Sequence, residues 1–201
     1  CWVKFLEMGR AERVKLGKIL TRINNIHLYS AFNTWVATID EKHRQISALI
    51  NEKIQQDQGA FFNSILGTLN HIYVADIIWL RRFAQHPQSY QSLTQLPELL
   101  SYQALAQIVT QDLAILDLRR QELDVIIINW CLELKSEDLA ENLQYFDTKG
   151  NLYHKNFGQL IYHFFNHQTH HRGQVSTLIS QQGLDLGITD LLKIIPEYVE
   201  G

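Results

Sequence analysis

Residues 66–80 read LGTLNHIYVADIIWL, and the spacing of their side chains decides the fold class. Positions on one stripe of an α-helix recur every three or four residues, here at Ile65, Leu69, Ile72, Asp76 and Leu80. This spacing predicts a helix over about residues 61–85. The pair His86-Pro87 ends it, because the residue before a proline avoids the helical region. One imidazole, His71, lies inside this apolar helix.

The same periodicity predicts three more helices, over about residues 21–54, 101–134 and 157–182. Ser101 and Asn156 are expected N-caps, and Gly183 is the expected C-terminal glycine. The sequence DTKG at 147–150, between alternating apolar residues, predicts a small hairpin. The β-branched run at 125–128 continues the helical period, so it is assigned to the third helix.

Four long helices around one core predict an all-α fold, an antiparallel four-helix bundle with a small hairpin between the third and fourth helices. With 201 residues the chain is long enough for one well-buried core. We therefore expect a single domain over residues 1–201, with its core at about 21–195 and an N-terminal extension at 1–20.

Composition narrows the classes of partner. The net charge is −3 and the pI is about 6.3, whereas nucleic acids and anionic membranes require clustered basic residues. No apolar run approaches the ~20 residues that span a bilayer. Two cysteines in a chain of this size imply no disulfide framework. We expect a cytoplasmic protein that acts on small molecules or on protein partners.

Four of the nine histidines fall within nine residues of the segment IYHFFNHQTHHRGQ at 161–174. On a helix, His163, His167 and His171 share one face. Positions eight apart are separated by ~12 Å along the axis, so one ion can bind only a neighbouring pair. His170 is the main rival to His171, because it is three residues from His167.

A third ligand must then come from another helix, and His71 is the best candidate. An imidazole in an apolar helix needs a partner, since an unsatisfied buried polar group costs ~1–3 kcal/mol. The alternative is an ordinary hydrogen-bonded core histidine. Three neutral imidazoles with open coordination positions are typical of catalytic rather than structural metal sites.

Two other metal classes are excluded by spacing. Ferritin-like di-iron sites use Glu-x-x-His pairs, and the sequence contains none. The zincin pattern His-Glu-x-x-His is nearly matched at residues 167–171, but Gln168 stands where the general base would be. An amide cannot take a proton from water at neutral pH, so peptidase activity is not expected.

These segments resemble the DinB family. The strongest match is FNHQTHHRGQV at 165–175, which is similar to the Asn-His-x-x-His-His-Arg-Gly-Gln signature of the family's last helix. LNHIYVADIIWLRRF at 69–83 resembles its second-helix histidine segment, and LYSAFNTW at 28–35 and ITDLL at 188–192 resemble its first helix and tail. The resemblance covers about residues 21–195.

The resemblance implies a four-helix bundle with a three-histidine metal site, whose ligands carry over to His71, His167 and His171. It also implies a homodimer and enzymes that use a low-molecular-weight thiol, such as bacillithiol or glutathione S-transferases and mycothiol-dependent isomerases. Zn and Ni both suit three imidazoles. One departure is Gln168, where family members often carry Glu.

The leading functional hypothesis is therefore a thiol-dependent S-transferase or isomerase, because a divalent metal deprotonates a coordinated thiol and creates a nucleophile. Tyr29, Trp35 and Arg172 are predicted to contact the substrate, and Arg172 would do so by orienting an anionic group. The alternative role of Arg172 is a salt bridge at the end of the helix, without substrate contact. Phe164 and Trp79 are further candidates for the apolar wall. Asp76 is a conceivable base for metal-assisted hydrolysis, the second hypothesis. The third is a stress-related metal-binding module without catalysis.

Overall fold

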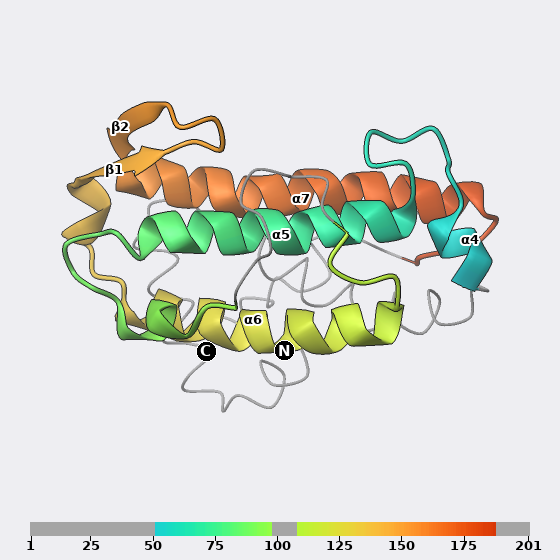
Figure 1. The fold of residues 1–201 in the computed structure, drawn as a ribbon, viewed down its shortest axis with the longest axis horizontal. Coiled ribbons are helices and arrows are strands. Elements are labelled where there is room, and N and C mark those ends of the chain that lie inside the picture. The colour runs from blue at the N-terminus through green and yellow to red at the C-terminus, as the bar shows by residue number, and fades with distance from the viewer. Residues whose placement is uncertain (1–50, 98–107, 188–201) are drawn as a thin grey trace, which may run out of the picture.

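The fold is seen in a computed structural model that describes residues 51–97 and 108–187 (Figure 1). This part of the chain is mostly helical, with one two-stranded antiparallel sheet. Its elements in chain order are α4 (Asn51–Gln55), α5 (Ile65–Phe83), η1 (Gln91–Gln95), α6 (Leu113–Glu133), η2 (Asp138–Ala140), β1 (Asn142–Phe146), β2 (Leu152–Asn156) and α7 (Phe157–Gln181). The helix expected over 21–54 lies outside the described residues except for α4.

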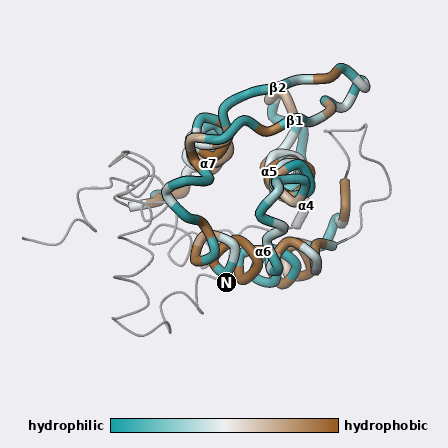
Figure 2. Tube along the Cα trace, turned by 90° about the vertical axis from the view of Figure 1, so that its left-hand side faces the viewer, coloured by the Kyte–Doolittle hydropathy of each residue, from teal (hydrophilic) through white to brown (hydrophobic). Residues whose placement is uncertain are grey.

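The three long helices lie at the corners of a triangle when seen end-on (Figure 2). In the side view, α5 lies between the other two long helices, with α7 above it and α6 below it (Figure 1). The hairpin covers one end of α7, and α4 lies at the opposite end of the long axis (Figure 1). No helix in residues 51–97 or 108–187 is both long and apolar enough to cross a lipid bilayer.

Helices α5 and α6 run in the same direction, so a fully antiparallel arrangement is wrong for this pair. At their starts, Asn70 Oδ1 accepts hydrogen bonds from the backbone N–H groups of Val109 (2.7 Å) and Thr110 (3.2 Å). Beyond their ends, the Tyr90 hydroxyl donates to Asp138 at 2.9 Å. Short loops force neighbouring helices to be antiparallel. The connection from 84 to 112 is long enough to return along the ~28 Å of α5.

Helix α5 begins at Ile65, four residues later than the periodicity predicts. Ser64 is the N-cap, and its hydroxyl oxygen accepts a hydrogen bond from the Gly67 N–H at 2.9 Å. The preceding residue, Asn63, has a φ of 65°, which a helix cannot contain. The predicted stripe is otherwise correct: Ile65, Ile72, Asp76 and Leu80 are all buried.

Helix α6 begins at Leu113, so the prediction of one helix from 101 to 134 is wrong at its start. Ser101 lies outside the described residues. Asp112 caps the helix, and its carboxylate accepts from the N–H groups of Ala114 (2.8 Å) and Ile115 (3.2 Å). The bonds from Val109 and Thr110 to Asn70 hold the preceding backbone outside the helix. The run at 125–128 is helical, as predicted.

The hairpin and the start of α7 are confirmed. Strands β1 and β2 pair antiparallel, with Tyr145 opposite Tyr153, and Asp147 accepts bonds within the turn that contains Gly150. The Asn156 side chain accepts from the Gln159 N–H at 2.9 Å and so caps α7. At the far end, Gly183 has a φ of 79°, as expected of a C-terminal glycine.

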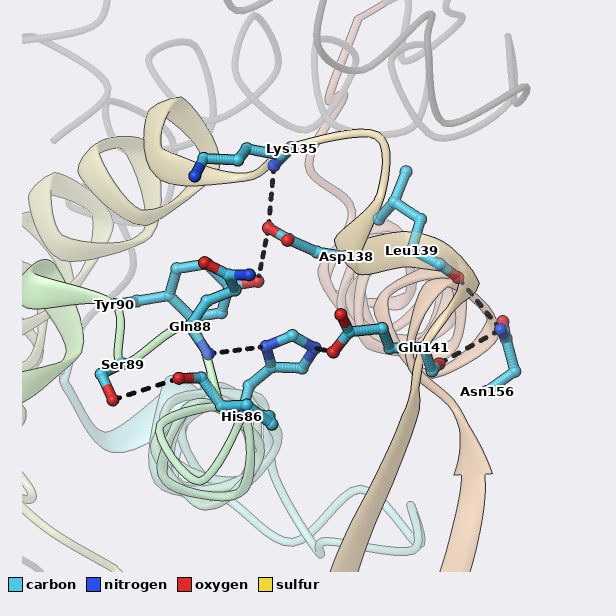
Figure 3. Close-up of polar contacts among 10 residues, drawn as sticks. His86, Gln88, Ser89, Tyr90, Lys135, Asp138, Leu139, Glu141 and Asn156 are labelled. Carbon is cyan, nitrogen blue, oxygen red and sulfur yellow. Dashed lines mark hydrogen bonds and ion pairs between the residues drawn. The ribbon is translucent and has the colours of Figure 1, made fainter.

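The far end of α5 is joined to the segment that follows α6 by buried polar contacts (Figure 3). His86, which is almost fully buried, lies with Nε2 3.3 Å from the Glu141 carboxylate, and its Nδ1 accepts from the Gln88 N–H. Asp138 accepts both from the Tyr90 hydroxyl and from the Lys135 N–H. These contacts connect the two segments at an end of the molecule that carries none of the predicted site residues.

The core has two parts, and the histidine segment of α7 crosses from one to the other. The large cluster contains Phe83, Trp130 and Phe165. The small cluster, near α4, contains six buried residues: Ile54, Ile65, Val175, Leu178, Ile179 and Leu186. Along α7, His167 and His171 lie between Phe165 and Val175. The imidazoles therefore lie at the boundary between the two clusters.

Candidate metal centre

Three imidazoles from two helices meet at one point. His71 on α5 lies with Nε2 3.2 Å from Nε2 of both His167 and His171 on α7, and the two α7 nitrogens are 3.0 Å apart. His71 and His171 are buried, and His167 is partly exposed. Among the described residues these three form the group of histidine, cysteine and acidic side chains that could hold a metal ion. The structure thus brings together the residues that the sequence proposes as ligands.

The spacing of these nitrogens fits a divalent ion. Metal–nitrogen distances of ~2.0–2.1 Å with tetrahedral angles separate two ligand nitrogens by ~3.3 Å. The observed separations are 3.0–3.2 Å. Hydrogen bonding alone satisfies such a triangle poorly, because each neutral ring has only one N–H to donate. Three lone pairs directed at a cation satisfy it completely.

Two side chains hold the imidazoles in place from outside. The Phe62 ring stacks on His71, with ring centroids 3.8 Å apart and an angle of 16° between the planes. The Gln174 side chain, one turn beyond His171, accepts from His171 Nδ1 through Oε1 at 2.7 Å. An imidazole that donates through Nδ1 keeps its Nε2 lone pair free.

The position of Phe62 depends on a glycine. Gly67 lies in the first turn of α5, and a Cβ atom there would lie 2.0 Å from the backbone oxygen of Phe62. No side chain fits at that distance. The loop before α5 can therefore fold back over the helix and bring Phe62 onto His71 because residue 67 is a glycine.

The imidazoles on α7 are held in their neutral form. Burial lowers the pKa of His167 to about 3, and the neighbouring His171 and His71 add to the effect. Burial likewise lowers the pKa of His171 to about 4. Only a neutral imidazole can bind a metal, so the folded site stays competent for binding well below the ordinary histidine pKa of ~6.5.

Gln168 does not join the histidines but faces a buried charged cluster. Its amide donates to Asp76 Oδ2 at 2.8 Å. The same oxygen lies 2.5 Å from Arg120, which also pairs with Asp124. Burial raises the pKa of Asp76 to about 6 despite the opposing effect of Arg120. Asp76, the candidate base for hydrolysis, is thus engaged with Arg120 and Gln168.

The other predicted site residues are distributed differently. His163 contacts the edge of Trp79, and Phe164 lies in the core against Phe83, so Phe164 forms no wall of the site. Among the described residues, no atom lies within 4 Å of the position that a Cβ atom of Gly173 would take. Tyr29 and Trp35 lie outside the described residues.

Arg172 is partly buried and forms no ion pair with any residue of 51–97 or 108–187. Its Nη1 is buried without a hydrogen-bond partner among those residues, and burial lowers the pKa of the guanidinium. The salt bridge considered as its alternative role is therefore not seen in the described part of the chain. A buried guanidinium with a free donor can receive an anionic group.

Sequence reasoning missed Phe62 and the role of Gln174. The separation of Gln174 from His171 by three residues was a usable signal, because such residues are neighbours on a helix. Phe62 gave no such signal. It reaches His71 through a turn that contains Asn63 at positive φ, and periodicity does not describe such a turn.

Comparisons with known proteins agree with this geometry. The sequence profile of the DinB family matches residues 23–197. The chain belongs to the DinB family. Protein DinB of Bacillus subtilis (strain 168) is 24% identical to it over 159 residues, which cover 79% of this chain and 87% of the relative. No solved structure matches the chain.

Proposed function

We propose that this DinB-family chain is a metal-dependent enzyme that uses a low-molecular-weight thiol, as an S-transferase or isomerase acting on small electrophiles. The observation that carries the proposal is the convergence of three Nε2 atoms within 3.0–3.2 Å of one another. His71, His167 and His171 would hold the ion, and Zn²⁺ and Ni²⁺ both suit such ligands. When bound, a divalent ion supplies Lewis acidity that lowers the pKa of a thiol reaching its open position.

The residues around the site support this chemistry in three ways. Phe62 covers one face of His71 and keeps water from that side of the site. Gln174 fixes the ring of His171. Neutral ligands leave the full positive charge of the ion to act on the thiol, whereas carboxylate ligands would cancel part of it.

Arg172 is proposed to bind a carboxylate of the thiol cofactor, because its Nη1 is buried without a partner among the described residues. Tyr29 and Trp35 are proposed to complete the substrate pocket. The Arg172→Gln variant should raise KM for a carboxylate-bearing thiol more than it lowers kcat.

The test pairs metal analysis with a thiol-transfer screen. Purified protein is analysed for bound metal, then loaded with Zn²⁺ or Ni²⁺ and incubated with monochlorobimane and bacillithiol, glutathione or mycothiol. The wild type should bind one ion per chain and accelerate conjugation with one of the thiols. His167→Ala should lose both properties.

Two histidine variants serve as matched controls. His154 is exposed on β2, so His154→Ala should bind metal like the wild type. His163 lies one turn from His167 with ring centroids 6.0 Å apart but is not one of the three clustered imidazoles, so His163→Ala should also bind metal like the wild type. Metal binding without conjugation by any of the three thiols would contradict the thiol proposal. Ester hydrolysis by the same protein would then favour metal-assisted hydrolysis, and inactivity towards both would favour a metal-binding module.

The proposal also includes a fourth bundle helix, a homodimer and a cytoplasmic location. A long helix formed by the residues before Asn51 would make the fourth member of the bundle beside α5, α6 and α7. The profile match that begins at residue 23 supports such a helix. A homodimer and a cytoplasmic location stay predictions from the sequence, and size-exclusion chromatography with light scattering measures the first.

A further inference from the structure

The side-chain amide of Gln174 connects two histidines that play different parts. Its Oε1 lies 2.7 Å from Nδ1 of His171, and its Nε2 lies 3.1 Å from Nε2 of His170. His171 is buried and belongs to the three-imidazole cluster, whereas His170 is exposed and does not. Residues 170, 171 and 174 all lie on α7, where spacings of three and four bring side chains together.

We propose that Gln174 is a positioning residue that selects the tautomer of His171 and excludes His170 from the metal site. This inference rests on the proposed metal centre and adds to it the residue that prepares one of its ligands.

The first step of the argument concerns His171. An amide oxygen can only accept, so the proton of the neutral ring must lie on Nδ1, and the Nε2 lone pair then faces His71 and His167. The opposite amide orientation would place an N–H against Nδ1. The ring proton would then lie on Nε2, where it would point at the two other nitrogens and block a cation.

The second step concerns His170. The amide nitrogen carries only donors, so the His170 Nε2 that it contacts must accept. This hydrogen bond stabilises the amide orientation in which Oε1 faces His171. It also occupies Nε2 of His170, one of the two ring nitrogens through which that residue could bind a metal. The choice between His170 and His171 as ligand is thus made by Gln174, which contacts both rings.

A contrast within the cluster supports a specific role. His167 Nδ1 is buried and has no hydrogen-bond partner among residues 51–97 and 108–187. Residues that orient metal-binding histidines from outside typically change metal affinity by about 10- to 100-fold when removed. Gln174 is such a residue for His171.

The experiment compares Gln174→Met, Gln174→Glu and His170→Ala in the full chain. Gln174→Met keeps the length of the side chain but removes both hydrogen bonds, so the Kd for Zn²⁺, measured by competition with a chelator, should rise about 10- to 100-fold. Gln174→Glu keeps the acceptor and should bind Zn²⁺ at least as tightly as the wild type. His170→Ala should still bind one ion per chain.

A second measurement does not depend on metal. Nitrogen-15 NMR of the metal-free wild type at pH 7.5 should show His171 protonated on Nδ1, and Gln174→Met should shift its population towards the Nε2-protonated tautomer. A Kd for Gln174→Met within twofold of the wild type would overturn the inference, and so would Nε2 protonation of His171 in the wild type. If the wild type bound no metal, the proposed function would fail, while the tautomer of His171 would still decide the role of Gln174.

Discussion

His167 and His171 are held neutral by burial, and this has a consequence for the stability of the metal-free protein. Their folded pKa values, about 3 and about 4, lie below the unfolded value of ~6.5. Between these limits the unfolded chain binds more protons than the folded one. The free energy of unfolding should therefore fall as the pH drops from about 6.5 to about 4. Asp76, whose pKa is raised to about 6, opposes this trend with a single proton.

Urea denaturation of the metal-free protein at pH 7.5, 6 and 5 measures the slope. Replacing His167 and His171 with glutamine removes both titrating rings, so the double variant should lose less stability between pH 7.5 and 5 than the wild type does. Equal slopes for the two proteins would show that the rings are not held neutral.

Gln168 gives a second prediction at this scale. Gln168→Glu would replace the amide that donates to Asp76 with a carboxylate facing a carboxylate. The loss of a donor to a buried acceptor should lower the free energy of unfolding by about 1–3 kcal/mol at pH 8. At pH 5 the introduced carboxyl group can take up a proton and donate it to Asp76 in a hydrogen bond, so the deficit should shrink. Gln159→Glu, an exposed change on the same helix, is the control.

At the scale of the elements, two helical glycines make a matched pair. Gly67→Ala places a methyl group against the Phe62 backbone and should displace the loop before α5. A clash of this kind typically costs about 1–3 kcal/mol, and loss of the Phe62 stack should also weaken Zn²⁺ binding. Gly173→Ala meets no atom of residues 51–97 or 108–187 within 4 Å and should raise helix stability by up to about 1 kcal/mol.

Thermal unfolding and Zn²⁺ titration of both glycine variants provide the measurement. A Gly67→Ala protein that is as stable as the wild type, with unchanged affinity, would show that the loop adapts without cost and that Phe62 contributes little to the site.

The elements also show what periodicity can and cannot predict. It located α5 and α7 and the caps Asn156 and Gly183, because amphipathic spacing and short-range hydrogen bonds are local properties of the sequence. It misplaced the start of α6, because Asn70 sits about forty residues away in the chain and holds the backbone there. The same non-local connection makes α5 and α6 parallel.

At the scale of the whole molecule, the site was predictable only in part. The i, i+4 pair of His167 and His171 follows from helix geometry, and His71 followed from the cost of an unpaired imidazole in an apolar helix. The burial of Arg172 Nη1 and the stacking of Phe62 on His71 depend on tertiary packing. The spacing of residues along a helix does not predict such contacts.

Metal binding should stabilise the whole molecule, since an ion that binds only the folded state shifts the unfolding equilibrium. At a free Zn²⁺ concentration 100 times the Kd, the gain is about 2.7 kcal/mol. Differential scanning fluorimetry with and without a chelator measures it. His71→Ala should abolish the shift, and His154→Ala should keep it. An equal shift in both variants would place the ion elsewhere.

The position of the imidazoles at the boundary between the two apolar clusters affects how firmly the two ends of the molecule are held together. Where an ordinary bundle would insert another layer of leucine or phenylalanine, α5 and α7 present polar rings, and polar rings provide little cohesion by themselves. A cation bound by histidines of both helices would hold α5 and α7 together at this level in place of apolar packing. Emptying the site should then loosen the end of the molecule around Ile54 and Leu186 before the end around Trp130, as an uneven pattern of amide hydrogen exchange.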